Sequence, residues 1–295
     1  MCNDEPPVPP ELSDLAGAIT PGGPGIDGIP PIDQPRFVAA SDATFPRDDD
    51  IVFGLELGGE HRAYPQLVLV WHEIFNDTVA GRPISVTYCP LTGTAVGFTG
   101  IPGEDVVSFG TSGNLVNSNL LMYDRPAGSR WPQILGTAIT GKLAGTVLPT
   151  HPLVWTTWGR WRAQHPDTVV LTTDTGALRN YGSDPYGSYR DQSGYYADDA
   201  VMFRTLHFDD SLSAKSVVLG VRAGGETAAI PKDVVRDRGT VDLEVGGQHC
   251  TASWDAALET ARVVRADTGE PADYMEAMWF AWVAFYPRTT LLERR

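Results

Sequence analysis

The chain has very little lysine and no long apolar segment. Only three lysines occur, Lys142, Lys215 and Lys232, so arginine carries nearly all of the positive charge. No stretch approaches the roughly 18 consecutive apolar residues that a membrane-spanning helix needs. The longest apolar stretch, residues 278–286, is too short and too aromatic. The sequence therefore predicts no spanning helix.

Acidic residues outnumber basic ones, 37 against 22, which gives a formal net charge of −15 at pH 7. Proteins that bind nucleic acid neutralise phosphates with Lys and Arg. This composition therefore argues against a nucleic-acid partner, and against adhesion to an anionic membrane surface. With 295 residues, 42% of them apolar, the chain can bury one large core or two smaller ones. We expect a small molecule as the partner, and the oligomeric state is left open.

Residues 1–35 are rich in Pro, Gly and Asp, a composition typical of a disordered tether. Cys2 precedes this segment, as in a mature bacterial lipoprotein whose signal peptide has been replaced by a start Met. The pattern predicts an exported protein, periplasmic or on the cell surface, that meets the membrane only through a lipid anchor on Cys2. The alternative is a chance cysteine in a disordered tail.

Residues 51–65 and residues 217–231 align as a degenerate internal repeat. Four pairs of identical residues fall at the same places: Gly54 and Gly220, Gly59 and Gly225, Glu60 and Glu226, Pro65 and Pro231. Each stretch has the pattern of a strand, a Gly-Gly turn and a returning strand. This pattern is typical of a β-hairpin.

A pair of tryptophans three residues apart also occurs twice. Trp158 and Trp161 are followed by a proline and a threonine, and Trp279 and Trp282 are followed by the same two residue types at the same spacing. Residues three apart share a helical face, and a proline just beyond them ends the helix. Each pair therefore predicts a short Trp-bearing helix.

These patterns predict a mainly β fold (β-rich α+β) with two pseudo-symmetric repeat halves, each built from hairpins and a short Trp-bearing helix. We place the first half at residues 36–175 and the second at 211–295, joined by a Tyr- and Gly-rich loop at 176–210. The chemically suggestive motifs all lie in the first half, so the second is expected to be a scaffold. Residues 179–200 could form a lid over the site or a packed crossover.

Several motifs of the first half occur together in one known family. They are WHEIFND at residues 71–77, YCPLTG at 88–93, SGNLVNS and MYDR within 112–125, and SRWPQILGTAITG at 129–141. With these motifs the chain resembles the DUF3179 proteins of bacteria and archaea, over a span from residue 51 to the C-terminus. The resemblance implies a family but not an activity.

Cys89 and His72 are the leading candidate catalytic residues. Cys89 ends an alternating strand and precedes a turn with free backbone N–H groups, where the pKa of a thiol can be lowered. A thiolate and a neutral imidazole form a soft ligand set suited to copper or zinc. Met122 could add a weak axial thioether. We expect copper first, in a metal-dependent oxidoreductase that acts on a small molecule.

The same residues are also compatible with other functional hypotheses. Without a metal, Cys89 could be a nucleophile and His72 its base, oriented by Asn76 or Asp77. Alternatively, the protein could be a non-catalytic surface lipoprotein that binds a small ligand between its halves. A buried structural cysteine and a hydrogen-bonded core histidine would carry no function. The spacing of the residues does not separate these hypotheses.

Polar and aromatic residues of the later motifs are candidates for binding a substrate. A guanidinium can grip a carboxylate through two parallel hydrogen bonds, while serine and asparagine beside a glycine either donate to a ligand or cap a turn. The chain has no P-loop, dinucleotide fingerprint, His-Glu-x-x-His or Gly-x-Ser-x-Gly motif. The candidates are Ser112, Asn117, Asp124, Arg125, Trp131 and Gln133.

Overall fold

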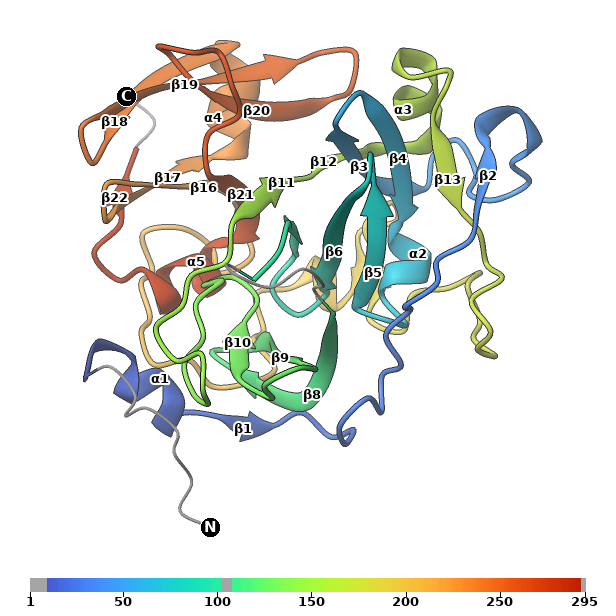
Figure 1. Cartoon of the computed structure of the whole chain (residues 1–295). Coiled ribbons are helices and arrows are strands. Elements are labelled where there is room, and N and C mark those ends of the chain that lie inside the picture. The colour runs from blue at the N-terminus through green and yellow to red at the C-terminus, as the bar shows by residue number, and fades with distance from the viewer. Residues whose placement is uncertain (1–9, 102–107, 293–295) are drawn as a thin grey trace.

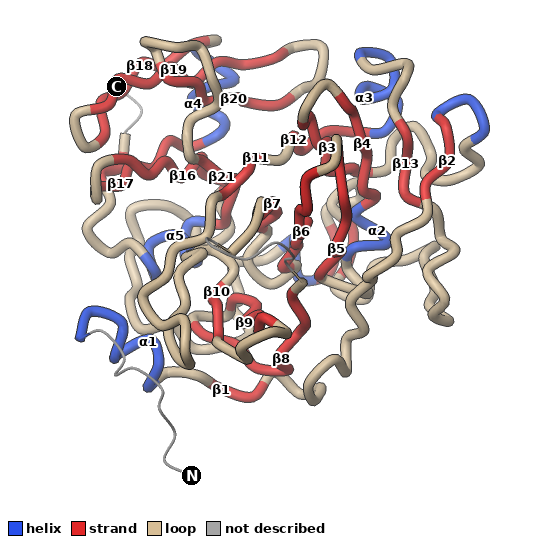
Figure 2. Tube along the Cα trace, viewed as in Figure 1, coloured by secondary structure: helices blue, strands red, loops and turns tan. Residues whose placement is uncertain are grey.

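The computed structural model describes residues 10–101 and 108–292. Within these ranges the strands form six sheets and the α-helices are short, so the mainly β fold predicted from the sequence is confirmed (Figure 2). The helices are α1 (Ser13–Gly17), α2 (Gln66–Leu69), α3 (Trp158–Gln164), α4 (Lys232–Arg238) and α5 (Trp279–Phe285), with short 3-10 turns η1 (Pro10–Leu12), η2 (Ala40–Asp42) and η3 (Tyr195–Ala197).

A five-stranded sheet with the order β12-β3-β4-β13-β2 forms one side of the first half. Its strands are β2 (Phe37–Ala39), β3 (Ile51–Leu57), β4 (Glu60–Pro65), β12 (Val154–Thr157) and β13 (Val169–Leu171). β3 and β4 form the expected hairpin, and Gly58 and Gly59 in its turn both have positive φ. Glycine adopts this conformation without the strain that other residues suffer.

The second half contains a sheet with the order β21-β16-β17-β22. Its strands are β16 (Val217–Ala223), β17 (Glu226–Pro231), β21 (Tyr274–Met278) and β22 (Thr290–Leu291). The hairpin lies in the centre, the strand before the Trp-bearing helix pairs antiparallel on one side, and the last strand pairs parallel on the other. The strands β12, β3, β4 and β13 are paired in the same way.

Each hairpin has a glycine that is covered by a tryptophan from the following short helix. A Cβ atom on Gly54 would lie 2.2 Å from the ring of Trp161, and one on Gly220 would lie 2.3 Å from the ring of Trp282. Each indole N–H donates to a threonine hydroxyl, at 2.9 Å in the first half and 3.0 Å in the second. The repeated glycine and tryptophan are therefore parts of one packing contact, since no side chain larger than hydrogen leaves room for the ring.

Each hairpin continues into a short helix and a three-stranded antiparallel meander. The strands are β5 (Ile74–Val79), β6 (Arg82–Cys89) and β7 (Thr94–Phe98) in the first half, and β18 (Thr240–Val245), β19 (Gln248–Asp255) and β20 (Thr260–Arg265) in the second. Each strand of the second meander starts at a fixed distance along the sequence from its counterpart in the first. This distance is the same as the one that separates Ile51 from Val217. An origin by duplication, and the boundaries of the two halves, stay predictions.

The first half also carries a sheet that joins it to the second. Its order is β1-β8-β9-β10, while a short strand, β11, extends the meander beside β7. The bounds are β1 (Thr20–Pro21), β8 (Phe109–Val116), β9 (Asn119–Asp124), β10 (Arg130–Pro132) and β11 (Thr150–Pro152). In Figure 1 this sheet lies below β5 and β6, with α5 of the second half beside it. Trp131 of β10 and Trp282 of α5 belong to one buried apolar cluster.

Residues 10–35 differ from the expected disordered tether. They form α1 and β1, and Gly22 N donates to Gly113 O at 2.8 Å, so the segment pairs with the free edge of β8. A Pro- and Gly-rich composition does not by itself show such an edge partner. Cys2 lies outside the described residues, and the lipid anchor stays a prediction. No helix of the described chain has the length and apolar character needed to cross a membrane.

The Tyr- and Gly-rich connection packs against the first half. It contains the short strands β14 (Gly187–Ser188) and β15 (Ser193–Gly194). The side chains of Tyr181, Tyr195 and Tyr196 are buried. Asp184 Oδ2 accepts hydrogen bonds from Gln66 Nε2 at 2.7 Å and from the Tyr196 hydroxyl at 2.8 Å. The connection is thus packed against the first half in this structure, and its role as a lid or a crossover stays a prediction.

Candidate functional site

His72 is fully buried and uses both ring nitrogens for hydrogen bonds within the protein. Nδ1 donates to Pro30 O at 2.7 Å, which leaves Nε2 to accept from the Tyr181 hydroxyl at 2.7 Å. Burial lowers the pKa of His72, which favours this neutral form. The histidine thus ties the N-terminal segment to the connecting loop, and it would have to break one of these bonds to bind a metal or take up a proton.

The two residues expected to orient this histidine have other partners. Asp77 accepts hydrogen bonds from Arg62 at 2.7 Å and from the Tyr64 hydroxyl at 2.6 Å. Asn76 donates to Phe109 O at 2.9 Å and accepts from Phe109 N at 3.0 Å, so it joins β5 to β8. Both side chains hold strands together.

Cys89 ends β6 and is 1% exposed. Its Sγ lies 3.9 Å from Ser118 O. Burial, followed by the nearby Glu73 carboxyl, raises the pKa of Cys89 to about 11. The expected lowering by turn N–H groups is therefore overcome by the loss of solvent. At neutral pH the group is a thiol, and a nucleophile or soft metal ligand would need the thiolate.

The expected metal ligands Cys89, His72 and Met122 are all buried in the structure. Nowhere in the described ranges are three or more His, Cys, Asp or Glu side chains grouped so that they could hold a metal ion. Met122 is buried in the same apolar cluster as Trp131 and Trp282. Cys89 and His72 each bond to other groups, as given above. Copper, zinc, a metal-free site and the redox function all stay predictions.

Three of the substrate-binding candidates stabilise the β9–β10 connection. Asp124 accepts from the indole N–H of Trp131 at 2.9 Å and from the backbone N–H of Ser129 at 2.9 Å. Gln133 Oε1 accepts from the hydroxyl of Thr94 at 2.6 Å within a buried polar network. Buried polar groups that are hydrogen-bonded in this way support the fold.

The other three candidates lie at different places. Ser112 Oγ accepts from the backbone N–H two residues later at 3.1 Å, which is the turn-capping role. Asn117 is buried and donates to Ala284 O of the second half at 2.9 Å. Arg125 donates to Asp33 at 2.7 Å near the surface. Each of these three side chains has a hydrogen-bond partner within the protein, and a role in binding a substrate stays a prediction.

Glu73, next to His72, was not among the candidate residues. It precedes β5 in the left-handed conformation, with a φ of 60°, and is only 8% exposed. Its carboxyl forms no hydrogen bond or ion pair with any other residue of the described ranges. Burial raises the pKa of Glu73 to about 8, so the carboxyl is mostly protonated at pH 7.

Glu73 lines a cavity of about 200 Å³. The walls come from the N-terminal segment, the turn after β6, the β8–β9 hairpin and the connecting loop. Among the described residues that form them, Glu73 is the one with a charged type of side chain. Tyr186 lines the same cavity, and its hydroxyl makes no hydrogen bond within the described part of the chain. Burial, followed by the Glu73 carboxyl, raises the pKa of Tyr186. The cavity therefore holds two polar groups without partners.

Three of the family motifs meet at this cavity, which takes Glu73 from WHEIFND, Leu91 from YCPLTG and Asn114 from SGNLVNS. A family model described as "Protein of unknown function (DUF3179)" matches residues 26–269. The chain belongs to the DUF3179 family. The matched range includes the connecting loop and most of both halves, whereas no curated protein and no solved structure matches the chain.

One signal in the sequence marks Glu73. Extending the repeat alignment beyond residue 65 at the same offset pairs Glu73 with Gly239. Gly239 has a φ of 77°, close to the 60° of Glu73. A glutamate at a position that favours glycine indicates a side chain kept for a reason other than stability.

Proposed function

We propose that the protein is an enzyme that acts on a small uncharged molecule bound in the cavity beside Glu73, with Glu73 as its acid–base group. The observation that carries the proposal is a carboxyl that is more than nine-tenths buried, lines a cavity and has no partner in the part of the chain that the structure describes. An unpaired buried polar group costs stability. Natural proteins keep such groups mainly where function requires them.

The size and charge of the cavity support this class of substrate. At about 200 Å³ the cavity is smaller than the 300–1,000 Å³ typical of sites for drug-sized ligands, so the substrate has few non-hydrogen atoms. Within residues 10–101 and 108–292, no Lys, Arg or His lines the cavity to neutralise an anion. A small polar molecule without charge fits both conditions.

The two polar groups suggest what happens to the substrate. A protonated carboxyl offers one O–H donor and one acceptor oxygen, and the hydroxyl of Tyr186 offers a second donor. Two donors directed at a carbonyl oxygen stabilise the negative charge that develops there during reaction, most strongly where water is excluded. A group with a pKa near 8 also gives up and regains its proton readily around neutral pH.

The test is a screen of small amides, ketones and esters for binding and turnover, read by ligand-observed NMR. Three proteins are compared: the natural chain, Glu73→Gln, and the control Asp210→Asn, which alters an exposed carboxyl. We expect compounds that bind the natural chain and the control equally and that lose turnover with Glu73→Gln. Turnover unchanged by Glu73→Gln, or no ligand at all, would reject the proposal.

A further inference from the structure

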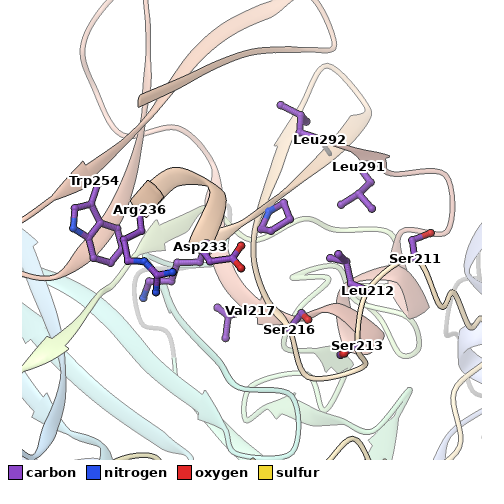
Figure 3. Close-up of a pocket in the computed structure, with 12 residues that line it drawn as sticks. Ser211, Leu212, Ser213, Ser216, Val217, Asp233, Arg236, Trp254, Leu291 and Leu292 are labelled. Atoms are coloured by element: carbon purple, nitrogen blue, oxygen red, sulfur yellow. The ribbon is translucent and has the colours of Figure 1, made fainter. Parts of the chain in front are cut away.

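β18 forms one edge of the three-stranded meander in the second half. Among the described strands it pairs with β19 alone, and in Figure 1 it lies at the outer margin of the molecule. One face of the meander is covered by α4, since Val234 and Val235 belong to the same apolar cluster as Leu243. Figure 3 shows this helix beside a pocket of about 760 Å³, with Arg236 next to Trp254 of β19. On the other face the side chains of β18 are exposed.

Alternate residues of β18 direct their backbone N–H and C=O groups away from β19. Val245 and Gln248 close a hairpin with a two-residue turn, and the residues that close such a turn bond to each other. Every second residue before Val245 therefore also bonds toward β19, which leaves Thr240, Asp242 and Glu244 pointing outward. No described residue hydrogen-bonds to these outward backbone groups. The edge thus offers donors and acceptors to a further strand.

In the first half the matching edge is paired with the protein's own N-terminal segment. The repeat alignment pairs Ile74 with Thr240 and Asn76 with Asp242. Ile32 N donates to Ile74 O at 3.0 Å, and Ile32 O accepts from Asn76 N at 2.8 Å. Ile32 therefore lies parallel to β5 and uses the backbone groups that are free on β18.

The same N-terminal segment continues along the first half as β2, which pairs with β13. In the second half β22 takes the place of β13, and no described strand lies on its outer side. Two separate edges of the second half thus lack the partner that residues 32–39 supply to the first.

The exposed face beside the β18 edge is acidic. Asp242 accepts a hydrogen bond from the hydroxyl of Thr251 at 2.7 Å, and the Glu244 carboxylate lies 3.8 Å from Nδ1 of His249. No described Lys or Arg forms an ion pair with either carboxylate. Antiparallel pairing of two β18 edges would bring these carboxylates opposite those of the other copy, and like charges opposite each other are destabilising. The charge therefore favours a basic partner over a second copy of this chain.

The first half also indicates where the positive charge belongs. Asn76 Nδ2 donates to the carboxylate of Asp33, the residue after Ile32, at 2.7 Å. Asp242 stands at the place of Asn76, so the second half has a carboxylate where the first has an amide donor. A segment that pairs with β18 as Ile32 pairs with β5 needs a positive charge at the place of Asp33.

We infer that the β18 edge binds an extended segment of a partner protein as an added parallel strand, with an apolar residue followed by a basic one. The backbone of the apolar residue bonds to Thr240 O and Asp242 N, and such main-chain bonds provide the affinity when a strand is added to a sheet. The basic side chain donates to the Asp242 carboxylate in a charge-assisted hydrogen bond. This inference is independent of the function proposed for Glu73.

The test uses a fluorescent peptide of residues 30–39 in which arginine replaces Asp33. Polarisation is measured with the natural chain, with Asp242→Lys and with the control Asp267→Lys, which reverses an exposed charge beyond β20. We expect the natural chain and the control to bind this peptide equally. Asp242→Lys, or the peptide with the natural aspartate, should weaken binding about tenfold, since a charged hydrogen bond contributes roughly that factor.

A second peptide carries a methyl group on the backbone nitrogen of Ile32, which removes the N–H donor and leaves every charge in place. Its binding should be lost, and this measurement needs no protein variant, so it is independent of folding. Absence of binding of the arginine peptide to the natural chain, or equal binding by Asp242→Lys or of the methylated peptide, would overturn the inference. Self-association that Asp242→Lys abolishes would assign the edge to a second copy of this chain and would also overturn it.

Discussion

The two halves share a backbone framework but differ in one position that matters for chemistry. In the first half Tyr88 N donates to the carbonyl oxygen of Glu73 at 2.8 Å, and in the second Trp254 N donates to that of Gly239 at 2.8 Å. Both receiving residues have positive φ. The second half has the residue type that suits this conformation. The first has a strained glutamate whose buried carboxyl is paired with no described residue. The first half therefore gives up stability at the place where the second does not.

The largest predicted effect tests the framework that the halves share. Trp161→Ala and Trp282→Ala should each lower the free energy of unfolding by about 3–5 kcal/mol, because each removes a buried indole that packs on a glycine. Chemical denaturation measures both losses. Leu178→Ala, at a side chain that is 97% exposed, is the control and should change little. A small loss in only one tryptophan variant would show that the halves are not held in the same way.

The next effect concerns pH and the Glu73 carboxyl. Its pKa is raised by folding from 4.5 to about 8, so the folded state binds this proton more tightly than the unfolded state. The stability that this proton contributes to the folded state is fully present below pH 4.5 and is lost as the pH rises to about 8. Above that pH no further stability is lost through this group. The loss is on the order of 4 kcal/mol. In Glu73→Gln this loss should disappear.

Denaturation curves between pH 5 and 9 measure this difference between the natural chain and Glu73→Gln. Asp210→Asn, which removes an exposed carboxyl, serves as the control and should follow the natural chain. If the natural chain and Glu73→Gln changed in parallel over this range, the carboxyl would be ionised as easily in the folded state as in the unfolded one.

Exchanging the two matched residues should give opposite changes of smaller size. Glu73→Gly relieves backbone strain and should stabilise the protein at pH 7 by about 1–2 kcal/mol, while Gly239→Glu introduces strain and should destabilise it by about 1 kcal/mol. Thermal unfolding reports both. Gly17→Ala, at a glycine without positive φ and with open space around it, should not destabilise. Loss of stability in both exchange variants would mean that the two positions are not equivalent.

The smallest predicted effect compares the stability lost at a cavity residue, Tyr186, with that lost at a residue that supports the fold, Tyr64. Tyr186→Phe removes a hydroxyl without a partner and should change stability by less than about 0.5 kcal/mol. Tyr64→Phe removes the hydroxyl that donates to Asp77 at 2.6 Å and should cost about 1–2 kcal/mol. Urea titration of both variants checks this. A larger loss for Tyr186→Phe would show that its hydroxyl supports the fold rather than a ligand.

Local patterns predicted the hairpins and the Trp-bearing helices, because the cause of each lies within a few residues. A Gly-Gly pair has positive φ in the turn at Gly58 and Gly59, and tryptophans three apart face one side of a helix. The pairing of Gly54 with Trp161 was not predicted, since it joins residues far apart in the chain. The repeat identified both partners but not their contact.

The candidate site could be predicted only in part, since its environment comes from distant segments. Cys89 and His72 are chemically suggestive in the sequence, but the hydrogen bonds of His72 come from Pro30 and Tyr181. The cavity beside Glu73 depends on the N-terminal segment and the connecting loop, and neither segment has a pattern that shows where it packs. Burial also raises the pKa of the Cys89 thiol, whereas the local turn geometry had predicted a lowered one.

The most direct test of the account is a titration of the Glu73 side-chain carboxyl by carbon-13 NMR, with the signal assigned by its absence in Glu73→Gln. The account predicts a midpoint near pH 8, together with a shift of this midpoint when a small uncharged ligand occupies the cavity. A midpoint near 4.5 would contradict it, because the carboxyl would then be solvated or paired and could not serve as the acid–base group.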